Sequence, residues 1–223
     1  MISMRGVRFG YGDGGFELRV DGLEVGEGER VAVVGPSGSG KTTLLGLMGG
    51  VLVPDEGVVS VDGVEVSGMR DGARRRFRAA RVGFVFQEFE LLEYLSVGEN
   101  IVLPYRLGDG GRLDDAARER GAGLAERVGL GEKLGRSVGT LSRGERQRVA
   151  ICRAMVREPG VILADEPTSS LDEGSSGAVM DLMMGLIEER GATLVMLTHD
   201  RGVLGRFDRV VDVRGLCGQG VAG

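Results

Sequence analysis

Cysteine is scarce in this sequence, which excludes one class of site and weakens the case for another. The two cysteines, Cys152 and Cys217, match no metal-binding spacing, so a cysteine-based metal centre is excluded. A disulfide between them is not expected either, and such low cysteine content fits a reducing compartment. Cys152 lies among apolar residues of a predicted helix, and we expect it to be a small residue of the hydrophobic core.

Positive charge and long apolar stretches are also scarce. The formal net charge is -5, which argues against a nucleic-acid binder with a broad basic surface. No apolar stretch approaches the roughly 20 residues of a membrane-spanning helix, and the first ten residues lack the apolar core of a signal peptide. The sequence therefore predicts a soluble chain, so the membrane part of any membrane process would be another chain. A local arginine cluster is interpreted as a solvated helix face rather than a patch for anionic lipid or an acidic partner; it comprises Arg74–Arg76, Arg78 and Arg81.

Lysine and histidine are rare enough for their positions to be informative. The basic residues are almost all arginine, with only two lysines, Lys41 and Lys133, and one histidine, His199. Lys41 and His199 both fall in the motifs described below. Rare residue types therefore occur where a reaction would need them.

The residues that are abundant indicate an α/β fold with inserted helices. The chain has 223 residues, 42% of them hydrophobic, which is enough for one domain with a sizeable core. Its 41 glycines are scattered without a period, so we interpret them as turns and tight packing. Strand–helix alternation predicts a mostly parallel sheet covered by helices, with an N-terminal antiparallel β subdomain. We expect one domain, with a core of about residues 1–87 and 158–215 and a helical lobe of about residues 88–157.

The individual elements follow from apolar periodicity. Strands or hairpins are predicted at Val7–Phe9, Phe16–Val20, Leu23–Val25, Arg30–Val34, Val58–Val66 (turning at Asp62-Gly63), Arg81–Phe86, Val161–Ala164, Thr193–Leu197 and Arg209–Val213. Helices are predicted at Thr42–Gly50, Val97–Leu107, Leu113–Val128, Arg143–Arg157 and Glu173–Arg190. Glycine-rich joints are expected at Gly108–Gly111 and Gly129–Gly139, and a frayed tail at Gly215–Gly223.

A phosphate-binding loop is the first motif. The segment Gly35–Thr42 reads GPSGSGKT, which matches the pattern G-x-x-x-x-G-K-[ST] between a predicted strand and a predicted helix. Its small residues let backbone N–H groups turn toward a phosphate, and the following helix directs its positive end at the same anion. Lys41 can neutralise β- and γ-phosphate oxygens, and the Thr42 hydroxyl can bind Mg²⁺. The sequence therefore predicts a nucleoside triphosphate site.

A pair of carboxylates and a capped helix are the second and third motifs. Asp165 and Glu166 end a strand of buried type, at the edge where α/β sheets bind ligands. A pair of this kind can neutralise charge beside a γ-phosphoryl group and orient a water molecule.

The segment Leu141–Glu145 reads LSRGE, which places Ser142 and Glu145 in the spacing of a capping box at a helix N-terminus.

The order of these motifs resembles that of the ATP-binding cassette (ABC) ATPases, the motor subunits of ABC transporters. The resemblance covers about residues 2–213 and implies the ABC ATPase fold, a phosphate-loop NTPase core with an inserted helical lobe. LSRGE resembles the signature motif, commonly L-S-G-G-Q, which in this family closes on the γ-phosphate held by a partner subunit. Arg143 and Glu145 depart from that pattern, whereas Ser142 and Gly144 keep it. The departure at Arg143 puts the rate of turnover in more doubt than nucleotide binding.

The resemblance also implies roles for single residues. Asp165 would hold Mg²⁺ through water, Glu166 would be the general base, and His199 would hydrogen-bond the γ-phosphate. Gln87 would reach Mg²⁺ and the attacking water, and Tyr11 would stack on adenine, with Phe9 as the alternative. The full expected set is catalytic Glu166, His199 and Gln87; nucleotide-binding Tyr11, Gly35, Pro36, Ser37, Gly38, Ser39, Gly40, Lys41, Thr42, Thr43, Ser142, Gly144 and Glu145; and metal-binding Thr42, Gln87 and Asp165. Asp172, in Ser169–Asp172, is either a residue of the dimer interface or an N-terminal acid of the next helix.

The function implied is ATP binding and hydrolysis with Mg²⁺, coupled to transport. Two copies, or this chain with a similar ATPase, would sandwich ATP and drive a separate membrane permease from the cytoplasmic face of the membrane. The runs Arg146–Ile151 and Val161–Thr168 are similar to those of the lipoprotein-release and macrolide-export group. A cell-division cassette, a soluble cassette acting on nucleic acid or ribosomes, and a cassette that binds ATP without turnover remain alternatives. No nucleic-acid partner is expected.

Overall fold

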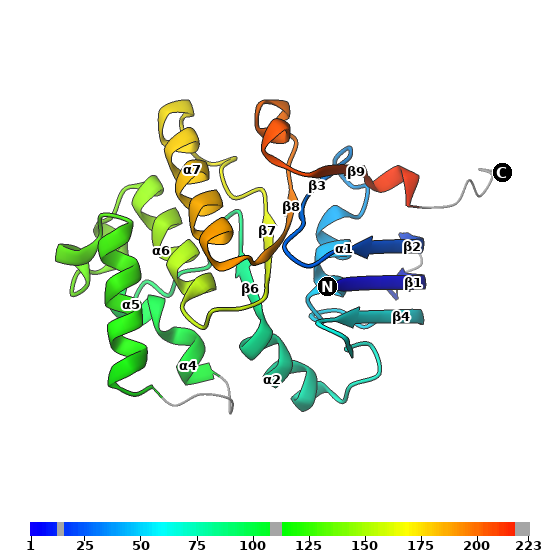
Figure 1. Cartoon of the computed structure of the whole chain (residues 1–223), viewed down its shortest axis with the longest axis horizontal. Coiled ribbons are helices and arrows are strands. Elements are labelled where there is room, and N and C mark those ends of the chain that lie inside the picture. Colours follow the sequence, from blue (N-terminus) through cyan, green and yellow to red (C-terminus); the bar gives the residue numbers. More distant parts are fainter. Residues whose placement is uncertain (13–15, 108–112, 217–223) are drawn as a thin grey trace. The chain divides into compact units, whose positions relative to one another are not determined.

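The computed structural model describes residues 1–12, 16–107 and 113–216 (Figure 1). By its internal contacts the chain divides into two compact units. The first unit holds Met1–Arg78 and the chain from Thr193 onward, and the second holds Ala79–Ala192. Each predicted motif lies wholly within one of these units.

An antiparallel sheet forms the N-terminal part of the first unit (Figure 1). Its strands, in spatial order, are β2 (Glu17–Val25), β1 (Ile2–Gly10), β4 (Glu56–Val61) and β5 (Val64–Glu65). The predicted antiparallel subdomain is therefore confirmed. The three short segments expected before residue 30 belong to only two strands. The second and third both lie in β2, because β2 pairs with β1 before and after Asp21. The predicted turn at Asp62-Gly63 joins β4 to β5, with both residues at positive φ.

A parallel set of strands carries the phosphate loop in the same unit. Strand β3 (Arg30–Val34) pairs with β8 (Thr193–Leu197) on one side and β9 (Arg209–Asp212) on the other. Helix α1 (Lys41–Met48) packs against β8 and β4 through its buried leucines. Two short 3₁₀ turns follow β8 and β9; they are η3 (Arg201–Arg206) and η4 (Val213–Gly215). The three central residues of β3, Val31 to Val33, are fully buried, so the loop that follows β3 starts from a well-packed strand.

The arginine cluster forms helix α2 (Asp71–Arg81), and part of it has a structural role. Arg74 and Arg78 both donate to the backbone carbonyl of Gly50, at 3.0 and 2.8 Å. The predicted solvated face is therefore right for exposed Arg75 and Arg76 but incomplete, because two arginines anchor the helix to the end of α1.

The second unit packs helices against one parallel strand pair. Strand β6 (Val82–Val85) pairs with β7 (Val161–Asp165), and helix α6 (Arg143–Met155) lies against β6. A Cβ at Gly83 would lie 2.3 Å from the Ala154 carbonyl oxygen, so glycine is required for this close approach. The other elements of the unit are α3 (Val97–Ile101), α4 (Leu103–Leu107), α5 (Asp115–Arg127), η1 (Gly131–Lys133), η2 (Val138–Thr140) and α7 (Glu173–Arg190). Helices α3 to α6 lie within the expected lobe of residues 88–157, whereas α7 lies outside it, and the division into core and lobe stays a prediction.

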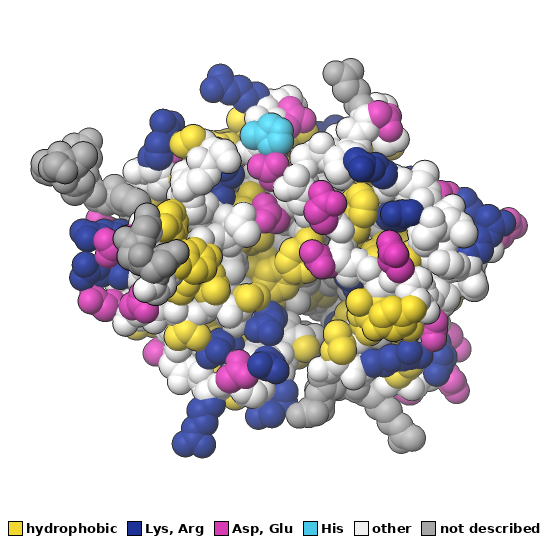
Figure 2. All heavy atoms as spheres, turned by 180° about the vertical axis from the view of Figure 1, so that it is seen from behind, with side chains coloured by type: hydrophobic (Ala, Val, Ile, Leu, Met, Phe, Trp, Pro, Cys, Tyr) yellow, Lys and Arg dark blue, Asp and Glu magenta, His cyan; other side chains and the backbone are white. Residues whose placement is uncertain are grey.

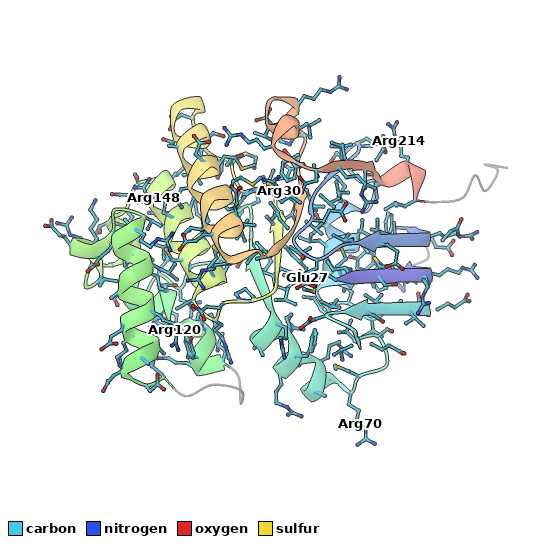
Figure 3. The ribbon with its side chains drawn as sticks, in the orientation of Figure 1. Glu27, Arg30, Arg70, Arg120, Arg148 and Arg214 are labelled. Carbon is cyan, nitrogen blue, oxygen red and sulfur yellow. The ribbon has the colours of Figure 1, made fainter. Side chains whose placement is uncertain are left out.

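Two features of this unit differ from or sharpen the sequence interpretation. The single helix expected over Val97–Leu107 is two short helices that break at Val102, because Pro104 has no N–H to continue the hydrogen bonding back to Asn100. Tyr105 then braces the second helix: its hydroxyl donates to the Val156 carbonyl and accepts from Arg120 (Figure 3). The joint predicted at Gly108–Gly111 and the tail from residue 217, including Cys217, lie outside the described residues.

No helix in the described ranges combines the length and apolar character needed to cross a membrane.

Candidate functional site

The phosphate loop connects β3 to α1 and is shaped by glycines at positive φ. Gly38 has φ 76° and Gly40 has φ 88°, values in the left-handed region that favours glycine. Lys41 reaches back across the loop, and its Nζ donates to the carbonyl oxygens of Gly35 and Pro36 at 2.9 and 3.0 Å. The ammonium is thereby held over the concave side of the loop, where a phosphate would meet it.

The start of α1 keeps its backbone donors for a ligand. The N-cap residue is Gly40, and within the described residues α1 has no side-chain cap, whereas Ser96, Asp114, Ser142 and Asp172 cap α3, α5, α6 and α7. Uncapped N–H groups at a helix N-terminus attract anions through both hydrogen bonding and the helix dipole. Ser39 adds a buried hydroxyl that has no hydrogen-bond partner among the described residues. This local chemistry fits a phosphate.

Aromatic side chains border the same loop. The Tyr11 hydroxyl lies 3.2 Å from the Thr43 hydroxyl on α1, and the Tyr11 ring makes an edge-on contact with Phe9. Tyr11 is 46% exposed, so its ring is accessible to a planar ligand. Phe16 packs on the loop from the other side: a Cβ at Gly40 would lie 2.7 Å from its ring. The sequence interpretation named Tyr11 and Phe9 but missed Phe16, whose contact with the loop has no local sequence signal.

His199 lies at the same edge of the sheet as the phosphate loop. In the parallel register Val33 pairs with Leu197, so Gly35 and His199 each follow that pair by two residues. The Thr198 amide donates to the Val33 carbonyl at 3.1 Å, which extends the pairing to the residue before His199. The imidazole is exposed at the surface, where Figure 2 shows it in cyan. The first unit therefore brings together the phosphate loop, Tyr11 and His199.

The second unit brings together Gln87 and the carboxylate pair by the same geometry. Val85 pairs with Ala164 in parallel register, so Gln87 and Glu166 each follow that pair by two residues. Asp165 is the last residue of β7, and both carboxylates are half-buried. Ligands gather at this carboxyl edge in parallel sheets.

The backbone at Glu166 is in an unusual conformation. Its φ is 43°, a left-handed value that costs a non-glycine residue about 1–3 kcal/mol and that concentrates at functional sites. The Glu166 carbonyl accepts from the Ser169 amide at 3.2 Å and from the Ser169 hydroxyl at 2.9 Å. The turn that follows therefore holds Glu166 in this conformation.

The loop that follows Gln87 is held by one buried and one half-buried side chain that the sequence interpretation did not name. Asn100, fully buried in α3, donates to the carbonyls of Leu92, Leu95 and Ser96 and accepts from the Leu92 amide. Arg153, on α6, donates to the carbonyls of Phe89 and Glu90. An isolated Asn or Arg in a helix carries no local signal of such a role.

The signature turn, Leu141–Gly144, starts α6 with a complete capping box. The Ser142 hydroxyl accepts from the Glu145 amide at 3.3 Å, and the Glu145 carboxylate accepts from the Ser142 amide at 2.8 Å. The Lys133 ammonium donates to the other Glu145 oxygen. These contacts, with the Lys133 hydrogen bond the strongest cause, lower the pKa of Glu145 from its usual 4.5 to about 2. Ser142 itself is exposed, so this rigid turn can meet another molecule.

Arg143 connects the signature turn to the chain beyond Glu166. Its Nη1 donates to the Ser170 carbonyl at 3.2 Å, and a Cβ at Gly144 would lie 3.7 Å from Ser175 in the first turn of α7. Asp172 caps α7 by accepting from the Ser175 amide, so the local alternative for Asp172 is confirmed. Its role at a dimer interface stays a prediction.

The expected site residues thus form two groups, one in each unit. The phosphate loop, Tyr11 and His199 lie at one sheet edge of the first unit, and Gln87, Asp165, Glu166 and the signature turn lie in the second. Their assignment to catalysis, nucleotide and metal stays a prediction. Cys152 is fully buried on α6, as expected, and burial raises the pKa of its thiol to about 12.

Comparisons with known proteins identify the family of the chain. The family model described as ABC transporter matches residues 18–169. The chain is 42% identical over 206 residues to the lipoprotein-releasing system ATP-binding protein LolD of Xanthomonas campestris pv. campestris (strain 8004), covering 91% of this chain and 85% of that protein. It is 39% identical to the macrolide export ATP-binding/permease protein MacB of Syntrophobacter fumaroxidans (strain DSM 10017 / MPOB), covering 96% of this chain and 30% of that protein.

A solved structure has the same fold. The dimeric ATP-binding cassette MJ0796, in a post-hydrolysis state bound to ADP and Pi, superposes with a TM-score of 0.85 at 34% identity, covering 95% of this chain and 94% of that one. Family model, relatives and fold all point to the same group that the phosphate loop, the carboxylate pair and the signature turn indicated. The chain belongs to the ABC transporter family, as one of its ATP-binding cassette ATPases.

Proposed function

We propose that this chain binds and hydrolyses ATP to power a separate membrane permease. ATP would sit with its phosphates in the loop Gly35–Thr42, against the uncapped amides of α1 and the Lys41 ammonium. The adenine would stack on the exposed ring of Tyr11, whose hydroxyl contact with Thr43 fixes it beside α1. These contacts supply binding and orientation of the nucleotide.

The hydrolytic groups would come from three strand ends. Glu166, at the end of β7, accepts a proton from the attacking water, and His199, after β8, donates to the γ-phosphate. The Thr42 hydroxyl, the Gln87 amide oxygen and the Asp165 carboxylate are the oxygen donors that Mg²⁺ prefers, so their chemistry fits this ion. When bound, Mg²⁺ would neutralise charge on the β- and γ-phosphates.

One observation carries the proposal that two copies act together. Ser142 is exposed at the head of a rigidly capped helix, where an anion of another molecule can reach the positive end of the helix. We propose that this serine and the Gly144 amide close on the γ-phosphate held by a second cassette, with the site completed by Glu145. Closure would then spend nucleotide-binding energy on a conformational change.

The partner we propose is a permease of the lipoprotein-release or macrolide-export type, at the cytoplasmic face of the membrane. Two relatives support this group: LolD is the ATP-binding protein of a lipoprotein-releasing system, and MacB is a macrolide export ATP-binding/permease protein. The pull on the permease would pass through the loop after Gln87, which Asn100 and Arg153 hold rigid.

The test compares the wild-type chain with Glu166→Gln. We expect wild type to hydrolyse ATP and Glu166→Gln to lose activity by at least about 100-fold, because the general base is removed. Light scattering should show that Glu166→Gln with ATP forms a dimer that wild type forms only transiently.

Two controls make the result specific. Asp181→Asn, an exposed acid on α7, should keep wild-type activity, since α7 carries it away from the strand ends. Equal ATPase rates for wild type and Glu166→Gln would contradict the proposed base, and a monomeric Glu166→Gln at saturating ATP would contradict closure of two copies.

A further inference from the structure

We propose that Arg143, where the common signature pattern has glycine, is a positioning residue that ties the signature turn to the turn that carries Glu166. The tie is the hydrogen bond from Arg143 Nη1 to the Ser170 carbonyl, at 3.2 Å across 27 residues of chain. A glycine at this position has no side chain to make it. The effect of this hydrogen bond on ATP hydrolysis rests on the proposed function. The hydrogen bond itself is present in the chain whatever that function is.

The tie reaches the backbone of Glu166 through one short turn. Ser170 follows Ser169, whose amide and hydroxyl both bind the Glu166 carbonyl. The Leu171 amide donates to the Thr168 carbonyl at 3.1 Å and closes the same turn. Displacing the Ser170 carbonyl would therefore strain the contacts that hold Glu166 at its left-handed φ of 43°.

Several polar atoms of α6 and of this turn are incompletely satisfied. Among the described residues, the Gln147 amide, the Arg148 Nε and the Ser170 hydroxyl are buried without a hydrogen-bond partner; Arg148 is labelled in Figure 3. The Ser170 hydroxyl therefore does not help to fix the turn, whereas the Ser170 carbonyl does so through its hydrogen bond from Arg143.

The opposite side of the signature turn is braced. Both Glu145 oxygens are occupied, one by the Ser142 amide and one by the Lys133 ammonium, so the turn cannot easily absorb a displacement. A displacement of Ser142 would therefore also displace Arg143 and, through its hydrogen bond, the Ser170 carbonyl. In the proposed dimer, Ser142 meets the partner's nucleotide while Glu166 acts on the nucleotide of its own chain. Arg143 would transmit contact at one nucleotide to the base at the other.

The experiment uses three variants of the full chain. Arg143→Met keeps the length of the stem and removes every donor, Arg143→Lys restores one donor, and Arg136→Met is the control. Arg136 is an exposed arginine on the loop before the signature turn, so this control removes the same charge from the same region. Hydrogen–deuterium exchange of residues 166–172 is measured without nucleotide, and kcat and KM for ATP are measured separately.

We expect Arg143→Met to speed exchange in residues 166–172 by about two- to tenfold, the factor that loss of one ordinary hydrogen bond gives. We also expect kcat to fall by about two- to tenfold with KM for ATP within about twofold, because Arg143 is not among the residues proposed to bind the chain's own nucleotide. Arg143→Lys should recover part of both changes, and Arg136→Met should show neither.

Unchanged exchange in Arg143→Met would overturn the proposal, whatever the activity. Faster exchange with unchanged kcat would also overturn it, since the contact would then be structural only. Failure of the proposed function looks different: wild type itself would not hydrolyse ATP, and the exchange data would still decide whether Arg143 fixes the Glu166 turn.

Discussion

The starts of helices α1 and α6 are built in opposite ways. At α1 the cap is a glycine in left-handed geometry that offers no side-chain cap, and the buried Ser39 hydroxyl has no hydrogen-bond partner among the described residues. At α6 the cap is Ser142, Glu145 closes a capping box, and Lys133 and Arg143 brace it on two sides. Both have the N-terminal dipole that attracts anions.

The two helices use the same feature, a helix N-terminus, in different ways: one binds a ligand with it, and the other caps it internally. The α1 start leaves hydrogen-bonding capacity unused by the fold, so a ligand can gain from it at a cost in stability of the free protein. The α6 start uses its capacity internally and offers only an exposed, rigid serine. The first should respond to mutation mainly through ligand affinity, and the second mainly through folding and dimer closure.

The largest effect should come from removing the charge at the α1 start. In Lys41→Met we expect ATP affinity to fall by about 10- to 150-fold, because a charge-assisted hydrogen bond to phosphate is worth about 1.5–3 kcal/mol. Titration calorimetry measures the affinity, and thermal unfolding with and without ATP gives the accompanying shift. A variant that binds ATP as tightly as wild type would remove the contrast between the two helix starts.

The next effect concerns the glycine cap of α1. In Gly40→Ala the new Cβ meets the Phe16 ring at 2.7 Å, and φ is 88°, so we expect a loss of about 1–3 kcal/mol in the free energy of unfolding. Gly129→Ala is the control, since Gly129 also has positive φ, at 72°, but nothing lies within 4 Å of its Cβ position. Urea denaturation should show the larger loss at Gly40; equal losses would mean that the Phe16 contact contributes nothing.

A smaller effect is expected at the α6 cap. Ser142→Ala should cost about 1 kcal/mol of stability, the usual value of a serine cap, which lowers Tm by about 2–4 °C in a chain of this size. Ser96→Ala is a close match, because Ser96 also forms a complete capping box, with Glu99. Both variants should lose similar stability, but only Ser142→Ala should also lower kcat. A similar loss of kcat in both would assign the effect to folding alone.

The last effect depends on pH. The pKa of Glu145 is lowered from 4.5 to about 2, so its charged form stabilises the folded chain above pH 4.5 and this contribution is lost as pH falls toward 2. We expect Glu145→Gln to unfold at a lower temperature than wild type at pH 7, and the gap to shrink between pH 4.5 and 2. Calorimetry across that range measures it. A gap that is constant with pH would exclude the Lys133 ion pair as its cause.

Much of the fold and of each half of the site could be predicted from the sequence. The phosphate loop, the strand ends at Asp165 and His199, and the Ser142–Glu145 capping box are local patterns, with spacing fixed by one element at a time. Parallel pairing then follows from strand–helix alternation. The β1 and β2 strands were harder, because the Asp21-Gly22 dipeptide resembles a turn and only pairing with β1 keeps it extended.

The contacts that could not be predicted join residues distant in the chain. Phe16 meets Gly40, Arg153 meets Phe89, and Arg143 meets Ser170, each through a geometry that no periodicity specifies. Lys133 was noted as a rare residue without a role, since its partner Glu145 had already been assigned to the cap. The break at Val102 is an exception: Pro104 has no N–H to donate to the Asn100 carbonyl, and the apolar periodicity across the break concealed this signal.

The distribution of lysine has a consequence for chemical labelling. Amine-directed reagents meet only two side chains in this sequence, Lys41 and Lys133. One spans the carbonyls of the phosphate loop, and the other is paired with the carboxylate of the α6 cap. A single acylation experiment followed by mass spectrometry therefore measures the accessibility of the lysine at each helix start in the same sample. ATP should protect Lys41 in the monomer, whereas protection of Lys133 should change only when the cap itself opens.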